Sequence, residues 1–533
     1  MSLQKLPTGI QIFEKIREND YLYVDKTKHL IEMVDSGEIY FLVRPRRFGK
    51  SLTCSTFEAL FEGKKELFKG LYAEEFLNRP NFKPSPVIRL DMNKVSTHKK
   101  PEDVEKLILF IVNSVAKRLG VKLEKDLPLE LVLQNLIEKT SDKYGERVVL
   151  IVDEYDNPYT NFFDKPDMAN EVRGILRDFY SQIKTSERYL KFIFITGITK
   201  TAKMGIFSTL NNITDISLDR KYGKICGLTK GEIKSYFTPY LENIAKEMNI
   251  SLEELMDKVK KYYDGFCFDG EHYLYNPYSF IYFLGQKDFL NYWIHTGSPS
   301  FLAAYLKSRN LTVEQFREIP VDRDFVFNPP AEIEVAPPES FLLQSGYLSL
   351  RKGNESDFCL DYPNTEVLNS MSKLLAQNIL PDKIEGELNL SRLLYKALYD
   401  KNIENIVDVF NSLLASIPHN DFDGAAKQDI KQKGYEMTAQ EWLCRSCLFS
   451  FLRGCGVVVS AEVQSNKGRA DLIILHKGNY FVVEIKMLPS TAKQALQQII
   501  NNNYAKPYPN AILLGLAIDD EKRQITEVES LIN

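Results

Sequence analysis

A Gly-Lys-Ser triplet at residues 49–51 ends the stretch RPRRFGKS. The apolar residues 39–43 before this stretch predict a buried strand, and residues 52–61 after it predict a helix. A strand, a tight loop with Gly-Lys-Ser and a helix are together typical of a phosphate-binding loop. The backbone N–H groups of such a loop and the start of its helix favour an anion. Lys50 would reach the β- and γ-phosphates of a nucleotide, and the Ser51 hydroxyl would bind Mg²⁺.

One position departs from the usual pattern G-x4-G-K-[ST], because Arg44 stands where the first glycine is expected. That glycine permits close approach of the backbone, and an arginine does not. A basic surface turn between a strand and a helix would have the same residues. The loop by itself therefore leaves both interpretations open.

A second stretch combines a predicted strand with two carboxylates. Residues 148–152, VVLIV, form a continuous apolar run, which is typical of a central strand in a parallel sheet. Asp153 and Glu154 follow at its carboxyl end, where Asp153 would hold Mg²⁺ through water and Glu154 would orient or activate the attacking water. An acidic loop after a core strand is the alternative, but together with the Gly-Lys-Ser turn the pattern favours nucleotide binding.

The stretch RPRRFGKSL of residues 44–52, with YVDKT of residues 23–27 upstream, resembles a known family. Its members are AAA-ATPase-like proteins of bacteria and archaea that carry a C-terminal PD-(D/E)XK nuclease-superfamily domain. The resemblance covers nearly the whole chain. Arginine is common in that family at the position of Arg44, and the resemblance implies that residues 1–35 pack near the nucleotide.

The resemblance also assigns a role to Thr196, at the end of the apolar stretch 190–197. In that family a polar side chain here lies between the two catalytic strands and senses the γ-phosphate, although a strand end followed by a turn would explain the pattern as well. The residues expected to bind the nucleotide are Arg46, Arg47, Phe48, Gly49, Lys50, Ser51, Leu52, Asp153 and Thr196.

Three residues near the C-terminus have types and spacing suited to metal-dependent hydrolysis. Glu484 and Lys486 are two residues apart in a predicted strand, so their side chains share one face. Asp471 lies 13 residues earlier on a neighbouring predicted strand, close enough to converge. Two carboxylates beside a lysine suit Mg²⁺-assisted phosphodiester hydrolysis, in which the metal activates water and the lysine positions or deprotonates it. A Glu–Lys pair on an exposed strand face is the alternative.

This part of the chain, in the order helix, hairpin, hairpin, helix, strand, agrees with the core of the PD-(D/E)XK superfamily. The resemblance implies that Glu441, on the first helix, joins the metal site and that Gln498 flanks it. The residues expected to act in catalysis are Glu154, Asp471, Glu484 and Lys486. Those expected to bind metal are Ser51, Asp153, Glu441, Asp471 and Glu484.

The composition is that of an ordinary globular protein, with 533 residues, 44% hydrophobic and 26% charged. The net charge of −4 means that any nucleic-acid site must be a local basic patch. No run approaches the about 18 apolar residues that a membrane helix needs, and the opening residues do not have a signal-peptide pattern.

Seven scattered cysteines favour reduced thiols in the cytoplasm. Cys444, Cys447 and Cys455 could bind zinc, but a place in a helix core is favoured.

The alternation of strands and helices predicts βαβ units, and hence an α/β fold with a parallel sheet and helices on both faces. We expect a P-loop domain over residues 1–226, followed by a helical lid and small middle module over 227–375. A helical spacer and linker would occupy residues 376–433, with the polar stretch 419–433 as its flexible part. An α/β nuclease-like domain would occupy residues 434–533.

Two functions fit these observations. The first is an ATP-hydrolysing module coupled to a metal-dependent nuclease acting on nucleic acid, with DNA favoured, and with ATP and Mg²⁺ as cofactors. The second is an ATP-dependent switch whose nuclease-fold domain only binds nucleic acid or a protein partner. Arg173 and Arg177 share one face of a predicted helix, where they are solvated or serve a neighbouring subunit, which leaves an oligomer open.

Overall fold

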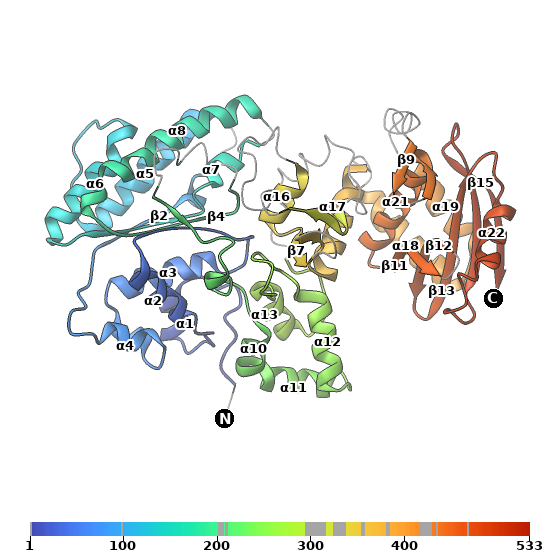
Figure 1. The fold of residues 1–533 in the computed structure, drawn as a ribbon, viewed down its shortest axis with the longest axis horizontal. Helices are drawn as coiled ribbons and strands as arrows, with labels where there is room; N and C mark the ends of the chain where they lie inside the picture. The colour runs from blue at the N-terminus through green and yellow to red at the C-terminus, as the bar shows by residue number, and fades with distance from the viewer. Residues whose placement is uncertain are drawn as a thin grey trace. The chain divides into compact units, whose positions relative to one another are not determined.

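The computed structural model describes residues 3–96, 100–163, 165–200, 207, 212–293, 316–322, 337–352, 358–379, 384–415, 429–432, 435–465 and 468–532 (Figure 1). These residues form two compact units. The first comprises the described residues up to 293 and residues 316–367, and the second begins at Leu368. The finer division into four parts stays a prediction. Within the described ranges, no helix is long and apolar enough to cross a membrane.

The first unit is built on a parallel five-stranded sheet with the strand order β2-β3-β4-β1-β5. The strands are β1 Ile39–Val43, β2 Val87–Asp91, β3 Val148–Asp153, β4 Leu190–Gly197 and β5 Thr214–Asp215. Residues 148–152 of β3 are completely buried, as expected of a central strand covered on both faces. Strand β4 lies between β1 and β3, so the loops after all three strands meet at one edge of the sheet.

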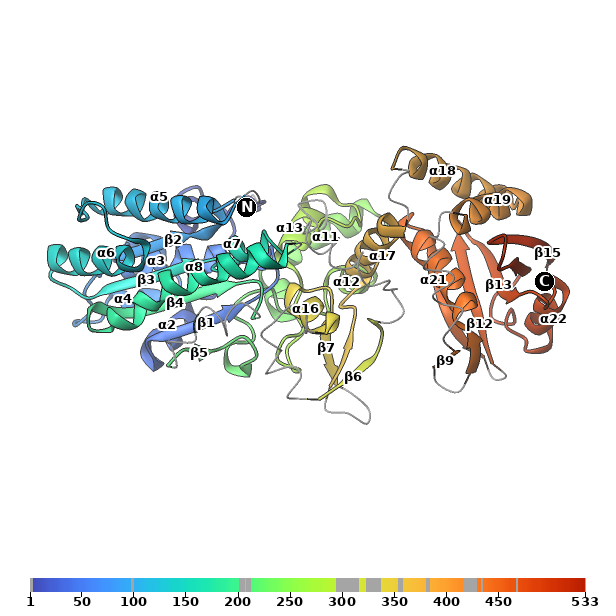
Figure 2. The ribbon, with the colours of Figure 1, turned by 90° about the horizontal axis from the view of Figure 1, so that it is seen from above.

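Helices cover both faces of this sheet (Figures 1 and 2). One layer contains α5 Pro101–Leu119, α6 Leu129–Tyr144 and α8 Pro166–Thr185, which pack against one another. The other face carries α3 Lys50–Phe61, with α1 Phe13–Glu18 packed on α3, and α2 Thr27–Ser36 packed against α4 Ala73–Leu77. The predicted α/β fold with a parallel sheet and helices on both faces is confirmed.

A helical region follows in the same unit. It contains α10 Lys230–Glu232, α11 Thr238–Glu247, α12 Leu252–Tyr263 and α13 Pro277–Gln286, and α16 Pro338–Ser345 comes later in the chain. The side chains of Thr229 and Glu232 form a capping box at the start of α10. Each satisfies a backbone N–H of the other, so the polar groups at this helix start are paired.

A small antiparallel sheet of order β6-β8-β7 completes the first unit. Its strands are β6 Ile319–Val321, β7 Ser349–Lys352 and β8 Phe358–Asp361. Strands β7 and β8 are antiparallel neighbours. Among the residues that the structure describes, strand β6 pairs with β8 alone, and an edge strand tolerates Pro320, which has no N–H to donate.

The second unit carries the five-stranded sheet β11-β12-β13-β14-β15. Its strands are β11 Val458–Ser465, β12 Gly468–His476, β13 Asn479–Met487, β14 Ile512–Asp519 and β15 Gln524–Ile532. Helix α22 Ala492–Asn501 connects β13 to β14, which pair in parallel, while the other neighbours are antiparallel. Helix α21 Ala439–Gly454 packs against this sheet.

Three further helices come earlier in the chain, α17 Thr365–Ile379, α18 Ile384–Asp400 and α19 Ile403–Leu414, and Figure 2 shows α18 and α19 side by side. The linker predicted over residues 419–433 lies largely outside the described residues. Its residues 429–432 form β9, which pairs with β10 Tyr435–Thr438, so the prediction is wrong there. A β-ladder is held by backbone hydrogen bonds, and these form in a polar segment as readily as in an apolar one.

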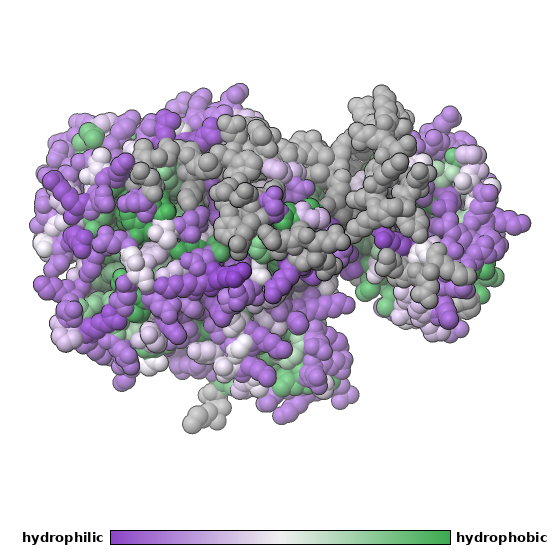
Figure 3. Space-filling model, in the orientation of Figure 1, coloured by the Kyte–Doolittle hydropathy of each residue, from purple (hydrophilic) through white to green (hydrophobic). Residues whose placement is uncertain are grey.

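The described part of the face seen in Figure 3 is mostly hydrophilic, with small separate hydrophobic areas. The seven cysteines are all thiols. Cys444 and Cys447 are buried in α21, and Cys455 follows that helix, which agrees with a helix core. Among the described residues, no group of three His, Cys, Asp or Glu side chains is arranged to hold a metal ion.

Candidate functional site

The loop between β1 and α3 places the Lys50 ammonium and the backbone N–H groups of the helix start at the edge of the parallel sheet. Gly49 has φ 101° and Arg47 has φ 66°, so both lie in the left-handed region that glycine tolerates best. This backbone turns directly into α3, which begins at Lys50, and its N-terminal N–H groups lack helical partners. The Lys50 ammonium donates to the carbonyls of Arg44 and Pro45, each at 2.9 Å.

Lys50 also meets the acidic end of β3. Its Nζ lies 3.1 Å from Glu154 Oε1, and both side chains are nearly buried. Glu154 has φ 55°, a left-handed conformation that is uncommon for residues other than glycine. The lysine and carboxylate that the sequence assigned separately are therefore direct partners.

Asp153 is buried beside them with one oxygen engaged. Its Oδ2 lies 3.3 Å from Arg89 Nη2. Within the described residues, neither Asp153 Oδ1 nor Glu154 Oε2 has a hydrogen-bond partner. Burial, and then the neighbouring Glu154, raise the pKa of Asp153. Buried carboxylate oxygens without partners are unfavourable unless a cation or water satisfies them.

A cavity of about 490 Å³ opens over this group. The residues that line it include Gly9, Gln11, Arg46, Arg47, Gly49, Lys50, Ser51, Leu52, Asp91, Glu154, Ile198 and Tyr278. The cavity has the size of a small-molecule site. Segments far apart in the chain therefore meet here: the lead-in before α1, the loop after β1, the end of β3, and α13.

Three predicted nucleotide-binding residues, Asp153, Thr196 and Phe48, do not line this cavity, and Asp153 is buried beside the lining residue Glu154. Thr196 is opposite Leu42 in the sheet, between β1 and β3 as expected, but its hydroxyl donates to the Leu42 carbonyl at 2.9 Å and it does not line the cavity. Phe48 is buried and packs edge-on against Phe266 and Phe268. It faces a second, apolar pocket.

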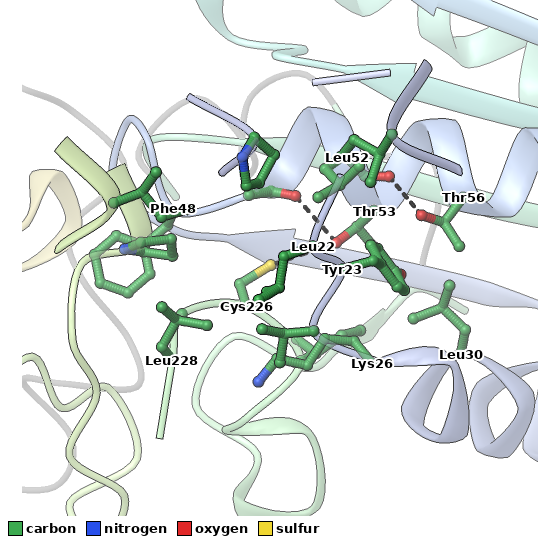
Figure 4. A pocket seen from close by; sticks show the side chains of 18 of the residues that line it. Leu22, Tyr23, Lys26, Leu30, Phe48, Leu52, Thr53, Thr56, Cys226 and Leu228 are labelled. Atoms are coloured by element: carbon green, nitrogen blue, oxygen red, sulfur yellow. Dashed lines mark hydrogen bonds between the residues drawn. The ribbon is translucent and has the colours of Figure 1, made fainter. Parts of the chain in front are cut away.

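This apolar pocket adjoins the first one and has a volume of about 100 Å³ (Figure 4). Its walls include Leu22, Tyr23, Lys26, Leu30, Phe48, Leu52, Thr53, Thr56, Cys226 and Leu228. The hydroxyls of Thr53 and Thr56 donate to the carbonyls of Gly49 and Leu52. The threonines therefore hydrogen-bond within α3, and the pocket keeps an apolar lining.

Sequence reasoning missed Asp156, which shapes the loop after β4. Its carboxylate accepts from the N–H groups of Ile198, at 3.0 Å, and Thr199, at 2.7 Å. Burial, and then Glu154, raise its pKa to about 6. The signal was present in the sequence as a third acid two residues after Glu154.

The C-terminal acids converge in the second unit. The Thr438 side chain caps α21 by accepting from the N–H of Glu441, which sets Glu441 in the first turn. Asp471 Oδ2 accepts from the N–H of Ile485 at 2.8 Å. Lys486 Nζ lies 3.3 Å from Glu484 Oε1 and 3.7 Å from Glu441 Oε1, and Gln498 donates to Glu484 Oε1. All five predicted residues of this site are thus brought together.

Comparisons with known proteins match two regions of the chain. Residues 7–207 match the family described as a predicted AAA-ATPase, and residues 439–528 match the PD-(D/E)XK nuclease superfamily. An uncharacterised protein in the vnfD 5′ region of Azotobacter chroococcum mcd 1 is 31% identical over 543 residues, covering 100% of both chains. This chain belongs to the AAA-ATPase-like family. No solved structure matches it.

The carboxylates of the nuclease-like domain suit a hard divalent cation, which prefers oxygen ligands. Burial, and then Asp471, raise the pKa of Glu484 to about 8, and burial raises the pKa of Glu441. A cation there would offset the charge that the carboxylates impose on one another. In the described structure Lys486 Nζ lies between Glu441 and Glu484, which explains why these acids do not surround a common point.

Arg445 is a further residue of this domain that sequence reasoning missed. It is almost fully buried on α21 and its Nη1 lies 3.7 Å from Asp471 Oδ1. It follows Glu441 by four residues, so the two share one face of the helix. The four-residue spacing between Glu441 and Arg445 was the feature of the sequence from which Arg445 could have been predicted.

The raised pKa of Glu484 predicts a pH-dependent stability of the metal-free AAA-ATPase-like protein. The carboxyl holds its proton more tightly when folded, so its contribution is complete below its ordinary pKa of 4.5 and is lost as the pH rises to about 8. In EDTA, the melting temperature of the wild type should fall across this range relative to that of Glu484→Gln. Calorimetry at both ends of the range would measure it, and equal falls in the two proteins would contradict the assignment.

Proposed function

We propose that this AAA-ATPase-like protein binds and hydrolyses ATP with Mg²⁺ and couples that cycle to a metal-dependent nuclease site that acts on nucleic acid, with DNA favoured. The observation that carries the proposal is the meeting of Lys50 with Glu154, at 3.1 Å, at the floor of a cavity beside the start of α3. A basic loop, a helix N-terminus and two carboxylates with unpartnered oxygens suit a phosphate chain with a cation.

In this mechanism Lys50 exchanges its contact with Glu154 for the β- and γ-phosphates. The backbone N–H groups of residues 46–52 would hold the phosphates, and Ser51 and Asp153 would hold a cation. When bound, Mg²⁺ would supply positive charge that offsets the charge of the β- and γ-phosphates. Glu154, released from Lys50, orients a water and accepts its proton. The exchange of partners at Lys50 therefore links nucleotide binding to the readiness of the base.

We propose that the apolar pocket of Figure 4 receives the base of the nucleotide. It shares Gly49 and Leu52 with the phosphate cavity, so one molecule can occupy both. Lys26 closes its polar side, because its Nζ is held by Glu232 at 2.6 Å and by the Lys224 carbonyl. A flat, largely apolar ring suits such walls.

In the nuclease-like domain, Asp471, Glu484 and Glu441 would hold Mg²⁺, which activates water and offsets charge on the phosphodiester. Lys486 positions or deprotonates that water, and Gln498 and Arg445 hold the carboxylates of Glu484 and Asp471.

Thr196 lies on β4, the strand between β1 and β3. Its hydroxyl donates to the Leu42 carbonyl, and a role as γ-phosphate sensor would require this hydrogen bond to break. Seven thiol cysteines support a location in the cytoplasm, since disulfides form in oxidising compartments.

The second candidate is an ATP-dependent switch whose nuclease-fold domain only binds nucleic acid or a protein partner. It is favoured by the close pairing of Lys486 with Glu441 and Glu484. A cleavage assay separates the two functions. Single- and double-stranded DNA and RNA are incubated with Mg²⁺ or Mn²⁺, with and without ATP. Cleavage supports the nuclease, and no cleavage under any condition supports the switch.

Lys50→Ala should abolish tight ATP binding, because the ammonium that faces the β- and γ-phosphates is lost. Isothermal titration calorimetry measures the affinity. The matched control is Lys28→Ala, which removes an exposed lysine outside both pockets. Wild-type affinity in Lys50→Ala would refute the phosphate-binding assignment.

Glu154→Gln should bind ATP but hydrolyse it at least about 100-fold more slowly, because the amide cannot accept the proton of the attacking water. Phosphate release under saturating ATP measures the turnover. If turnover stays at the wild-type rate, another residue must act as the base.

Asp471→Ala should lose divalent-metal binding and cleavage at the C-terminal site, since a hard cation depends on carboxylate oxygens. ATP hydrolysis should persist, because Asp471 and Lys50 belong to different compact units. Nucleic acid should still stimulate hydrolysis, and this stimulation should weaken with salt, because phosphate contacts supply most of the affinity. The exposed Asp520→Ala is the control. If DNA changes turnover in neither protein, a partner-regulated switch becomes the better explanation.

A further inference from the structure

Arg89 on β2 contacts the acidic end of β3 from below the phosphate cavity. Its Nη2 lies 3.3 Å from Asp153 Oδ2 and 3.4 Å from the Ser51 carbonyl. Its Nη1 lies 3.1 Å from Glu58 Oε2 on α3. One guanidinium nitrogen therefore touches both residues that the proposed function assigns to the cation.

The sheet register explains how Arg89 reaches them. Asp91 is paired with Asp153, and Arg89 with Ile151. Residues two apart in a strand share a face, so Arg89 lies on the same face of the sheet as Asp153, one step back from the edge. Helix α3 covers β2 and β3 and supplies the Ser51 carbonyl and Glu58. Neither Arg89 nor Asp153 lines the phosphate cavity, whereas Ser51 and Glu154 do, so any effect of Arg89 on the cavity passes through these neighbours.

The two carboxylate oxygens of Asp153 differ in their hydrogen-bond partners. Arg89 engages Oδ2, whereas Oδ1 is buried without a hydrogen-bond partner within the described residues. A ligand carboxylate that is held by one oxygen presents the other in a defined direction. Groups behind a metal ligand commonly fix its orientation in this way.

The negative charge of Glu58 can be compensated without Arg89. Arg118, on α5, lies 2.5 Å from Glu58 Oε1 and also donates to the Val87 carbonyl at 3.2 Å. Glu58 therefore already has one cationic partner. Arg89 differs from Arg118 in that it alone of the two reaches Asp153 and Ser51, which offers a matched pair of arginines for an experiment.

We propose that Arg89 is a positioning residue of the magnesium site: its guanidinium holds Asp153 Oδ2 and the Ser51 main chain, so that Asp153 Oδ1 and the Ser51 hydroxyl keep the spacing that a divalent cation needs. This inference rests on the proposed nucleotide site. The planar fork of arginine can hold two partners at once, which the point charge of a lysine does not reproduce.

The test compares Arg89→Gln, Arg89→Lys and the control Arg118→Gln in the full-length chain. ATP affinity is measured by calorimetry in EDTA and in Mg²⁺, and the Mg²⁺ concentration for half-maximal hydrolysis is measured separately from the maximal rate. Arg89→Gln should raise that concentration by about 10-fold or more, the effect expected when a group behind a metal ligand is removed. Its ATP affinity in EDTA should equal that of the wild type. Arg89→Lys should show a smaller shift, and Arg118→Gln should show none.

Equal Mg²⁺ requirements in Arg89→Gln and Arg118→Gln would overturn the inference. A loss of ATP affinity in EDTA as large as that in Mg²⁺ would also overturn it, because Arg89 would then support the fold rather than the cation. If the wild-type protein binds no ATP in either condition, the proposed function itself fails and the inference fails with it. A shift confined to Mg²⁺ supports the inference.

Discussion

Both sites are governed by the same constraint, which is that several carboxylates are buried close together. An ionised carboxylate in a low-dielectric interior is unfavourable unless a cation or hydrogen-bond donors compensate it. At the phosphate cavity, Lys50 compensates Glu154 and Arg89 compensates Asp153. In the nuclease-like domain, Lys486 lies between Glu441 and Glu484. The protein's own cations therefore compensate the carboxylates at both sites.

The two units bring their acids together by different routes. In the first unit, parallel strands end at a common edge, so residues from β1 and β3 meet although about a hundred residues separate them in the chain. In the second unit, Asp471 and Glu484 belong to adjacent antiparallel strands, β12 and β13. Glu441 is added by the capped first turn of α21. In the second unit a hairpin and a helix start thus bring the acids together, whereas in the first unit the crossover connections of the parallel sheet bring them together.

The phosphate-binding loop is also held from the helical region. The indole N–H of Trp293 donates to the Arg46 carbonyl at 3.1 Å, and the N–H of Trp293 donates to the buried Glu366. Arg47 lies over the ring of Tyr278 on α13. These contacts connect the loop between β1 and α3 to the helical region of the same unit.

The sequence by itself determined which residues could do chemistry. Gly-Lys-Ser after an apolar run, two acids after VVLIV, and a glutamate and lysine two apart are local patterns whose meaning follows from strand and loop geometry. They also led correctly to the α/β fold and to the family. Only the tertiary structure decided the partners: that Lys50 pairs with Glu154, that Thr196 turns to Leu42, that Phe48 faces an apolar pocket, and that Arg89 and Arg445 stand behind the acids. The physical reason is that pairing across a sheet or between a helix and a strand depends on register and packing between distant segments, whereas periodicity in the chain reports only on which face a residue lies.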